Sequence, residues 1–338
     1  MTKVIIHACS SILIRPNGIV RYINAVIDLQ RKLGHYVIFV SDSKPSQAIN
    51  AHQVMYDSTM SYYRPNMRDG HVWLQYDSGI KAQIRSALDC YGSADLIIAH
   101  DLHSFEAARE FAEDGIFVQH ETDILTAGAR FSYMDDEYIA QQFSAVNSET
   151  NWRIGMTVDS KNINPARPVP VPCPIQLQGQ VPPAERKTKD LLYIGDASER
   201  KGAREFMDMA RCLGVTPTVI THERDQELFE GADIHSFDLT ESIDMYRLMS
   251  RHKVAYIPSK NECPGLAIIE CLQFMPVVVD GQYHWTQYIA AAGADVKTGA
   301  DIESTIQYHL ANPGAYARDQ VERWAEEARE QWTTISNA

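Results

Sequence analysis

Two acidic residues, Glu262 and Glu270, flank a Pro-Gly pair and form the strongest chemical signal in the chain. The residues around them predict a strand, a loop, and then a helix that begins near Pro264 and Gly265. The first N–H groups of a helix have no intrahelical acceptor and can bind a phosphate. Glu270 would lie about 12 Å from Glu262 along the helix axis, so the two carboxylates could hold opposite ends of an elongated ligand. The alternative is one acid that complements the helix dipole and one solvated glutamate.

A second run of polar residues, 195–202, follows a predicted strand and precedes a predicted helix. Its Arg200 and Lys201 could neutralise a diphosphate, although a loop of this kind can also be merely solvated. The chain has no GxGxxG after its first strand and no GxxxxGK[ST]. Their absence argues against dinucleotide-dependent oxidoreductases and P-loop NTPases.

Polar or turn-forming residues also stand at the ends of six predicted strands. Any one of them is more simply a loop residue, but ligands of parallel α/β sheets bind outside the carboxyl ends of the strands. Together these strand ends indicate a polar crevice; they are His7, His100-Asp101, His120-Glu121, Gly195, Thr221-His222 and Pro258-Ser259.

The elements that must position these residues alternate along the whole chain. Short apolar runs predict strands at 4–6, 37–40, 71–76, 96–99, 116–119, 144–146, 191–194, 217–221, 234–237, 254–257 and 277–279. Helical spacing predicts helices at 202–213, 241–251, 264–274, 301–311 and 314–332, and one helix face made of Ile19, Tyr22, Ile23, Val26, Ile27 and Leu33. This alternation is typical of α/β proteins whose parallel sheets carry helices on both faces.

Seven prolines interrupt the alternation between 165 and 183, which predicts an extended linker with one edge strand. We therefore expect domains at 1–165 and 184–312, a linker at 166–183 and a helix at 313–338. A length of 338 residues suits two domains separated by a cleft.

Composition excludes several classes of protein. The net charge of −13 argues against binding nucleic acid or anionic membrane by bulk charge, although residues 1–170, with 15 Lys and Arg against 19 Asp and Glu, carry only −4 of it. No apolar run reaches the roughly 18 residues of a membrane span. Because the apolar stretch at residues 4–6 is short, we expect no signal peptide. The six cysteines form no CxxC pair. We expect a cytoplasmic enzyme with free thiols and no membrane span.

Five segments, in this order, resemble retaining glycosyltransferases of the GT-B fold, in the large fourth family. Residues 17–20 with 33–37 resemble its glycine loop and GHxV strand, and 118–121 its strand that ends in a catalytic-site histidine. Residues 144–150 resemble its Ser/Thr segment and 194–202 its GR…KG loop. Residues 262–270 have the E-x7-E spacing and are followed by PVV at 276–279. The resemblance covers about residues 4–310 and implies two Rossmann-like domains facing a cleft, with the last helix packed back on the N-terminal domain.

The resemblance also implies roles for individual residues. His120 would face the donor sugar, Lys201 would hold the diphosphate and stabilise the leaving group, and Glu262 would bind sugar hydroxyls. The remaining donor-binding residues would be Gly18 and the N–H groups of Gly265 and Leu266 at the phosphates, Glu270 at the ribose, and Arg200.

The chain departs from the family at two places that bear on catalysis. Asp196 stands where the family has an arginine, and Arg200 could substitute for it. The family's EPFG sequence is Glu262-Cys263-Pro264-Gly265 here, so the phenylalanine is missing and the proline stands one place later. Since Lys201 and the helix start supply the positive charge, we expect no essential metal and no tightly bound cofactor. In this family the leaving phosphate takes the acceptor proton. Glu121 or Asp123 would at most assist as a base or bind the acceptor; the alternative is that both are helix-capping or solvated acids.

The acceptor is the least constrained part. Residues 120–125 and the N-terminal segment are similar to phage DNA α-glucosyltransferases, which implies UDP-glucose as donor, double-stranded DNA with a flipped hydroxymethylated pyrimidine as acceptor, and the cytoplasm of an infected host. A DNA-facing surface, or else a solvated face, would comprise Tyr62, Tyr63, Arg64, Arg68, His71, Trp73, Lys81 and Arg85. The alternatives are the same chemistry on a bacterial surface glycan or small molecule, and a catalytically degenerate scaffold that binds a nucleotide or a protein.

Overall fold

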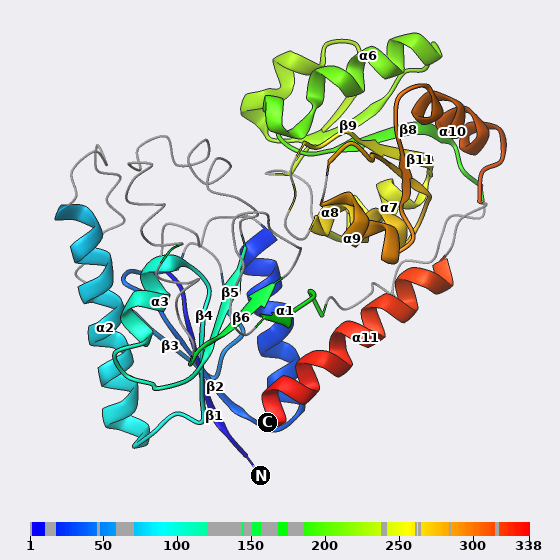
Figure 1. The fold of residues 1–338 in the computed structure, drawn as a ribbon. Helices are drawn as coiled ribbons and strands as arrows, with labels where there is room; N and C mark the ends of the chain where they lie inside the picture. Colours follow the sequence, from blue (N-terminus) through cyan, green and yellow to red (C-terminus); the bar gives the residue numbers. More distant parts are fainter. Residues whose placement is uncertain are drawn as a thin grey trace. The chain divides into compact units, whose positions relative to one another are not determined.

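The computed structural model describes residues 2–10, 18–45, 48–58, 71–120, 144, 151–156, 168–174, 186–237, 242–260, 262, 265–283, 285–314 and 318–338. The chain divides into two compact units. Unit 1 consists of residues 1–175 and 327–338, and unit 2 of residues 176–326. Each unit contains one parallel sheet with helices on both faces (Figure 1).

Unit 1 is built on a seven-stranded sheet in the order β3-β2-β1-β4-β5-β6-β7, in which every pair is parallel. Its strands are β1 (Val4–Ala8), β2 (Tyr36–Val40), β3 (Gln53–Met55), β4 (Leu96–Ala99), β5 (Ile116–Gln119), β6 (Arg153–Met156) and β7 (Pro168–Pro170). Its helices among the described residues are α1 (Gly18–Lys32), α2 (His71–Tyr91), α3 (Leu102–Ala108) and the last residues of α11 (Arg318–Asn337).

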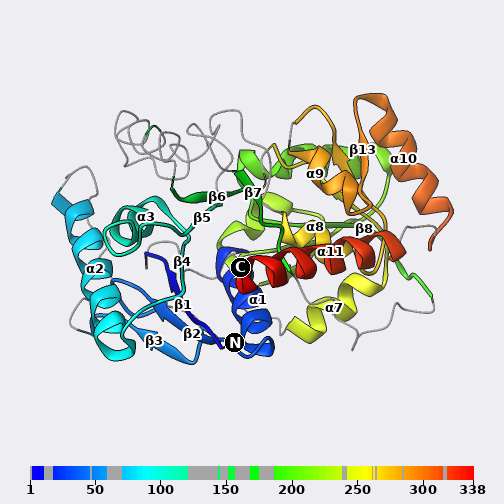
Figure 2. The same cartoon turned by 60° about the horizontal axis from the view of Figure 1, so that its bottom comes forward.

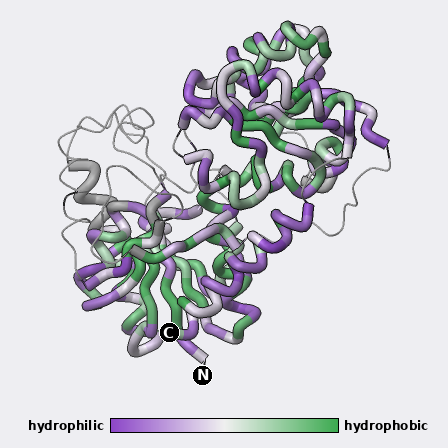
Figure 3. The backbone as a smooth tube through the Cα atoms, turned by 45° about the vertical axis from the view of Figure 1, so that its right-hand side comes forward, coloured by the Kyte–Doolittle hydropathy of each residue, from purple (hydrophilic) through white to green (hydrophobic). Residues whose placement is uncertain are grey.

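Alternation along the strands assigns side chains to the two faces of this sheet. Ile6 and Ile38 pack with Ile84 of α2, whereas Val37 and Phe39 pack with α1. Figure 2 shows α1 and α2 on opposite sides of the sheet. Figure 3 shows the strands as its most apolar segments, which is the pattern of a parallel sheet covered on both faces.

One strand prediction is wrong. Residues 71–76 form the first turns of α2 rather than a strand. The apolar residues that follow, Ile80, Ile84 and Ala87, recur every three to four positions and are fully buried, so the helical period extends through the segment. Of the strand predicted at 144–146, only residue 144 is described, in helical conformation.

The proline-rich segment does contribute the expected edge strand. β7 pairs only with β6 among the described strands and lies at the end of the sheet. Pro168 and Pro170 have no N–H to donate, and an edge strand tolerates them because one of its sides makes no ladder bonds.

Unit 2 is built on a six-stranded parallel sheet in the order β10-β9-β8-β11-β12-β13. Its strands are β8 (Lys189–Ile194), β9 (Thr218–Thr221), β10 (Asp233–Ser236), β11 (His252–Ile257), β12 (Val277–Asp280) and β13 (Asp295–Lys297). Its helices are α6 (Ala203–Leu213), α7 (Ser242–Ser250), α8 (Leu266–Leu272), α9 (Thr286–Ala291), α10 (Ala300–Ala311) and the start of α11, with 3-10 turns η1 (Glu199–Lys201) and η2 (Glu223–Phe229). In Figure 1, α6 and α10 lie on the opposite side of the sheet from α7, α8 and α9.

Both sheets reverse their direction of winding at one point. In unit 1 the chain runs outward from β1 to β3 and returns at β4, and in unit 2 it runs outward from β8 to β10 and returns at β11. The loops at such a switch point diverge from the strand ends and leave room for a ligand. The strand ends to inspect are therefore those of β1 and β4, and of β8 and β11. Among the described residues, no helix is long and apolar enough to span a bilayer.

Candidate active site

The two loops of unit 2 that carry the predicted donor-binding residues meet because β8 and β11 are neighbours. Lys260 N donates to the carbonyl of Arg200 at 2.8 Å, which ties the second loop to the first. Gly202 has φ +70°, and a Cβ at this position would lie 2.4 Å from the carbonyl oxygen of Pro258. The close approach of the loops therefore requires glycine at 202.

Lys201 and Glu262 form an ion pair at this junction. Lys201 Nζ donates to Glu262 Oε1 at 2.5 Å, and the two side chains are 17% and 11% exposed. Burial raises the pKa of Glu262, but the charges of Lys201 and Arg200 outweigh it and hold that pKa below its ordinary value. The carboxylate is thus ionised at neutral pH, and a cation and an anion stand side by side at the switch point.

Asp196, which replaces the arginine of the resembled family, is part of the same loop. Its Oδ1 accepts a hydrogen bond from Ser198 N at 3.0 Å, and its Oδ2 lies 4.0 Å from the guanidinium of Arg200. Burial raises the pKa of Asp196, but the Ser198 bonds and the charges of Lys201 and Arg200 lower it below its usual range. The carboxylate therefore bonds within its own loop and lies at ion-pair distance from Arg200.

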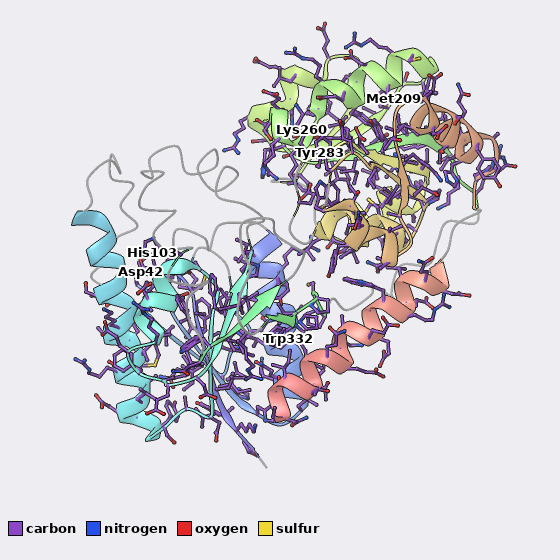
Figure 4. All side chains as sticks on the ribbon, in the orientation of Figure 1. Asp42, His103, Met209, Lys260, Tyr283 and Trp332 are labelled. Carbon is purple, nitrogen blue, oxygen red and sulfur yellow. The ribbon has the colours of Figure 1, made fainter. Side chains whose placement is uncertain are left out.

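The Lys260 side chain forms ion pairs that connect the second loop to the first loop and to α6. Its ammonium lies 2.9 Å from Glu199 and 3.3 Å from Glu205, and these hydrogen bonds raise its pKa. Figure 4 shows Lys260 beside Tyr283, whose pKa is raised by burial and by Asp280 although the charge of Lys260 opposes the shift.

The two ends of the predicted E-x7-E motif differ in their surroundings. Gly265, with φ +69°, precedes α8, and its carbonyl accepts the first intrahelical bond from Ile268 N at 2.9 Å. Glu270 is only 3% exposed and accepts a hydrogen bond from Tyr246 Oη at 3.4 Å. Glu270 is therefore a buried, hydrogen-bonded carboxylate and not a solvated one, while Leu266 is buried at the start of the helix.

In unit 1 the strand ends bring three histidines into contact. His7 lies near the end of β1, beside the switch point. His100 follows β4 and His120 follows β5, and all three side chains are at most 4% exposed. His7 Nδ1 lies 2.8 Å from His100 Nε2, and His100 Nδ1 lies 3.1 Å from His120 Nε2. The rings thus bond to one another in series; over the described residues, no group of three metal-ligating side chains could hold a metal ion.

Two partners of these histidines come from helix α1 and were missed in the sequence. Gln30 Oε1 lies 2.7 Å from His7 Nε2, and the Tyr22 ring meets His120 edge-on with centroids 4.9 Å apart. Gln30 continues the apolar spacing of Val26 and Ile27 and is fully buried. An amide on the buried stripe of a helix needs a polar partner, and that was the available signal.

Several predicted residues have other positions. Gly18 is the first residue of α1. Glu121, Asp123, Tyr62, Tyr63, Arg64 and Arg68 lie outside the described residues, as do the side chains of His71 and Trp73. Of the suggested DNA-facing group, Lys81 is paired with Glu110, and Arg85 lies over the Phe111 ring at 5.6 Å.

Comparison with known proteins extends the description of the fold. No family model and no curated protein matches the sequence. A sucrose-phosphate synthase from Thermosynechococcus elongatus has a TM-score of 0.70 at 15% identity, over 98% of this chain and 94% of that one. WaaG, a glycosyltransferase involved in lipopolysaccharide biosynthesis, has a TM-score of 0.61 at 15% identity, over 97% and 95%. A glycosyltransferase from Rickettsia africae has a TM-score of 0.63 at 13% identity, over 98% and 94%.

The chain has the GT-B fold. The predicted fold class, two Rossmann-like doubly wound parallel-sheet domains, is therefore confirmed. Within GT-B sheets of this order, the ion pair of unit 2 and the histidine series of unit 1 both occupy strand ends at or beside a switch point.

Proposed function

We propose that this protein is a retaining glycosyltransferase that moves a hexose from a nucleotide sugar to an acceptor hydroxyl. The observation that carries the proposal is the ion pair of Lys201 and Glu262, which two loops bring together at the switch point of a GT-B sheet. A sugar diphosphate needs a cation at its phosphates and an acceptor at its hydroxyls, and this pair offers both.

The donor is proposed to bind to unit 2 along the E-x7-E segment. Lys201 and Arg200 hold the diphosphate, and the N–H groups of Gly265 and Leu266 take phosphate oxygens. Buried Glu270 has a carboxylate suited to the ribose hydroxyls, as the resemblance implies. UDP-glucose is the donor to test first.

In the proposed step the bond between the anomeric carbon and the diphosphate oxygen breaks, and the acceptor oxygen bonds to the same face of that carbon. The departing phosphate takes the acceptor proton, so no side chain is needed as the general base. Lys201 stabilises the charge that develops on the leaving group, since a preformed cation in a site of low exposure needs no reorganisation. When the diphosphate binds, before the bond breaks, Lys201 directs N–H groups to the phosphates as well as to Glu262, which leaves part of that carboxylate free to accept from a sugar hydroxyl.

For the acceptor, we propose hydroxymethylated pyrimidine in DNA, supported by the resemblance of residues 120–125 and by the lower acidity of residues 1–170. A bacterial surface glycan or a small molecule is the alternative, favoured by the pairing of Lys81 with Glu110, which leaves one cation fewer for phosphates. A panel of nucleotide sugars incubated with hydroxymethylated DNA or with glycans, read by hexose mass shift, separates the two. If the protein does not bind duplex DNA even at low salt, the proposed DNA acceptor is contradicted.

A catalytically degenerate binding scaffold is the remaining candidate, and Asp196 is the observation that favours it. UDP release from UDP-glucose tests this directly. We expect release by the wild-type protein and loss of at least about a hundredfold in Lys201→Ala and Glu262→Ala, since each removes a group that acts on the transition state. Lys253→Ala is the matched control, because it removes a cation of unit 2 that pairs with Asp190 near the starts of β11 and β8, away from the proposed donor contacts. No release with any donor would overturn the enzymatic proposal.

A further inference from the structure

The histidine series of unit 1 contains more than the proposed reaction requires. Of these histidines, the resemblance implies a contact with the donor sugar for His120 alone, yet two further imidazoles and a glutamine amide are buried in line behind it. Stacking accompanies the bonds: the His7 and His100 rings have centroids 5.1 Å apart at 12°, and the His100 and His120 rings 5.4 Å apart at 23°.

The sheet explains why these three side chains meet. β1, β4 and β5 are consecutive in the sheet, and His7 is level with Ile98, which is level with Ile116. His100 lies two residues beyond Ile98, and His120 two residues beyond the position level with His100. Steps of two keep all three on one face, so they form a diagonal across neighbouring strands. This is the face that α1 covers, and Gln30 of α1 closes the series.

Hydrogen bonding fixes how protons are distributed along such a series. A neutral imidazole carries hydrogen on one nitrogen and a lone pair on the other. Each bond in the series joins the Nδ1 of one ring to the Nε2 of the next, so the choice at one end sets every ring. Gln30 Nε2 donates to Ser336 Oγ at 3.2 Å, which leaves its oxygen to accept from His7 Nε2.

From that end the order follows. His7 carries hydrogen on Nε2 and accepts at Nδ1 from His100, and His100 in turn accepts at Nδ1 from His120. The last ring then has hydrogen on Nε2 and a lone pair on Nδ1. The Tyr22 hydroxyl donates its hydrogen to the carbonyl of Val171 at 2.8 Å, so it does not donate to these nitrogens.

Burial keeps His7 and His100 uncharged. It lowers the pKa of His7 to about 4, although the bond to Gln30 opposes the shift. Burial, together with the neighbouring imidazoles His7 and His120, lowers the pKa of His100 well below its usual value. A proton on one ring would also break the order, because an imidazolium has no lone pair to accept with.

We propose that Gln30, His7 and His100 are positioning residues that hold His120 neutral with its hydrogen on Nε2, so that it meets the transferred sugar as a hydrogen-bond acceptor through Nδ1. This inference rests on the proposed function in one respect, the contact between His120 and the sugar. His120 Nδ1 would then accept a hydrogen bond from a sugar hydroxyl. A donor-sugar analogue with fluorine in place of that hydroxyl would lose this contact.

The proton order can be measured without any substrate. Two-bond 1H–15N correlation spectra of the full-length protein labelled with 15N-histidine report which ring nitrogen carries hydrogen. The His120 signals are identified by their loss in His120→Asn. We expect hydrogen on Nε2 of His120, His100 and His7 at pH 7. Hydrogen on Nδ1 of His120, or an imidazolium there, would overturn the proposal, and the wild-type spectrum suffices to decide.

A pair of variants at Gln30 tests the effect on activity. Gln30→Glu retains an oxygen that accepts from His7, whereas Gln30→Met has similar length and no acceptor. We expect Gln30→Met to give mixed tautomers at His120 and to lower kcat roughly tenfold to a hundredfold with little change in KM. Gln30→Glu should retain the Nε2–H form and most of the activity. Equal kcat in the two variants, both folded by circular dichroism, would contradict the positioning role.

The two proposals fail in different experiments. Wild-type protein that shows the expected tautomers but transfers no sugar removes the proposed function and the sugar contact together, and leaves the proton order. Protein that transfers sugar with hydrogen on Nδ1 of His120 removes the positioning proposal alone.

Discussion

At the scale of single residues, the pair of Lys201 and Glu262 has a thermodynamic consequence that does not depend on any substrate. Lys201→Met leaves the Glu262 carboxylate, only 11% exposed, with the more distant charge of Arg200. We expect the free energy of unfolding of unit 2 to fall by about 1–3 kcal/mol, because a poorly solvated charge loses its partner. Denaturant titration of the variant measures it.

The double variant Lys201→Met with Glu262→Gln is the control. Replacing the carboxylate by an amide removes the uncompensated charge, so this variant should recover part of the lost stability while UDP release stays absent. Strict additivity of the two single changes would show that the pair contributes no coupling.

Burial of His7 makes the stability of unit 1 depend on pH. The pKa of this histidine is lowered in the folded state to about 4 from 6.5, so below pH 6.5 the unfolded chain binds the proton more readily. Stability from His7 is therefore fully present above pH 6.5 and is lost as pH falls toward 4, by about 3 kcal/mol in all. Thermal unfolding between pH 4 and 7 measures the slope, and His7→Gln should show a shallower slope. An unchanged slope would contradict the burial argument.

At the scale of elements, the close approach of the loops after β8 and β11 depends on one glycine. Gly202→Ala places a Cβ against the Pro258 carbonyl and keeps φ at +70°. We expect a loss of about 2–4 kcal/mol in unit 2 and a large loss of UDP release, because the loops must part and separate Lys201 from Glu262. Differential scanning calorimetry and the release assay check the two effects.

Gly214→Ala is the matched control. Gly214 ends α6 with φ +64°, and a Cβ there would meet no atom within 4 Å. This change should lower the free energy of unfolding by only about 1–2 kcal/mol, because alanine is strained at a positive φ, and should leave UDP release unchanged. Equal effects of the two variants on release would show that the close approach at Gly202 is unimportant.

Elements also show what the sequence could and could not predict. Strands 96–99 and 116–119 were predicted with their observed bounds, because short β-branched runs are bounded by polar residues. The segment 71–76 was misassigned because six residues do not separate a strand from the start of a helix. The contact of Gln30 with His7 was not predictable, since it depends on strand order and on which face α1 covers, neither of which is local to the sequence.

At the scale of the whole molecule, α11 is divided between the units. Residues 318–326 belong to unit 2, where Trp324 meets the ring of Tyr288 edge-on at 5.7 Å. Residues 327–337 belong to unit 1, where fully buried Trp332 donates from Nε1 to the carbonyl of Pro172 at 2.9 Å. Figure 4 shows Trp332 at this helix. One helix thus contributes a tryptophan to each of two cores.

The division predicts that the two tryptophans stabilise different units. Trp332→Phe removes a buried hydrogen bond and part of a ring, so unit 1 should lose about 1–3 kcal/mol. Trp324→Phe keeps an aromatic ring at Tyr288 and should cost unit 2 less, about 1 kcal/mol. Calorimetry with limited proteolysis, which reports the cleavage sites exposed by each transition, assigns each loss. If both variants destabilise the same unit, the division of α11 is wrong, and the helix belongs to one core along its whole length.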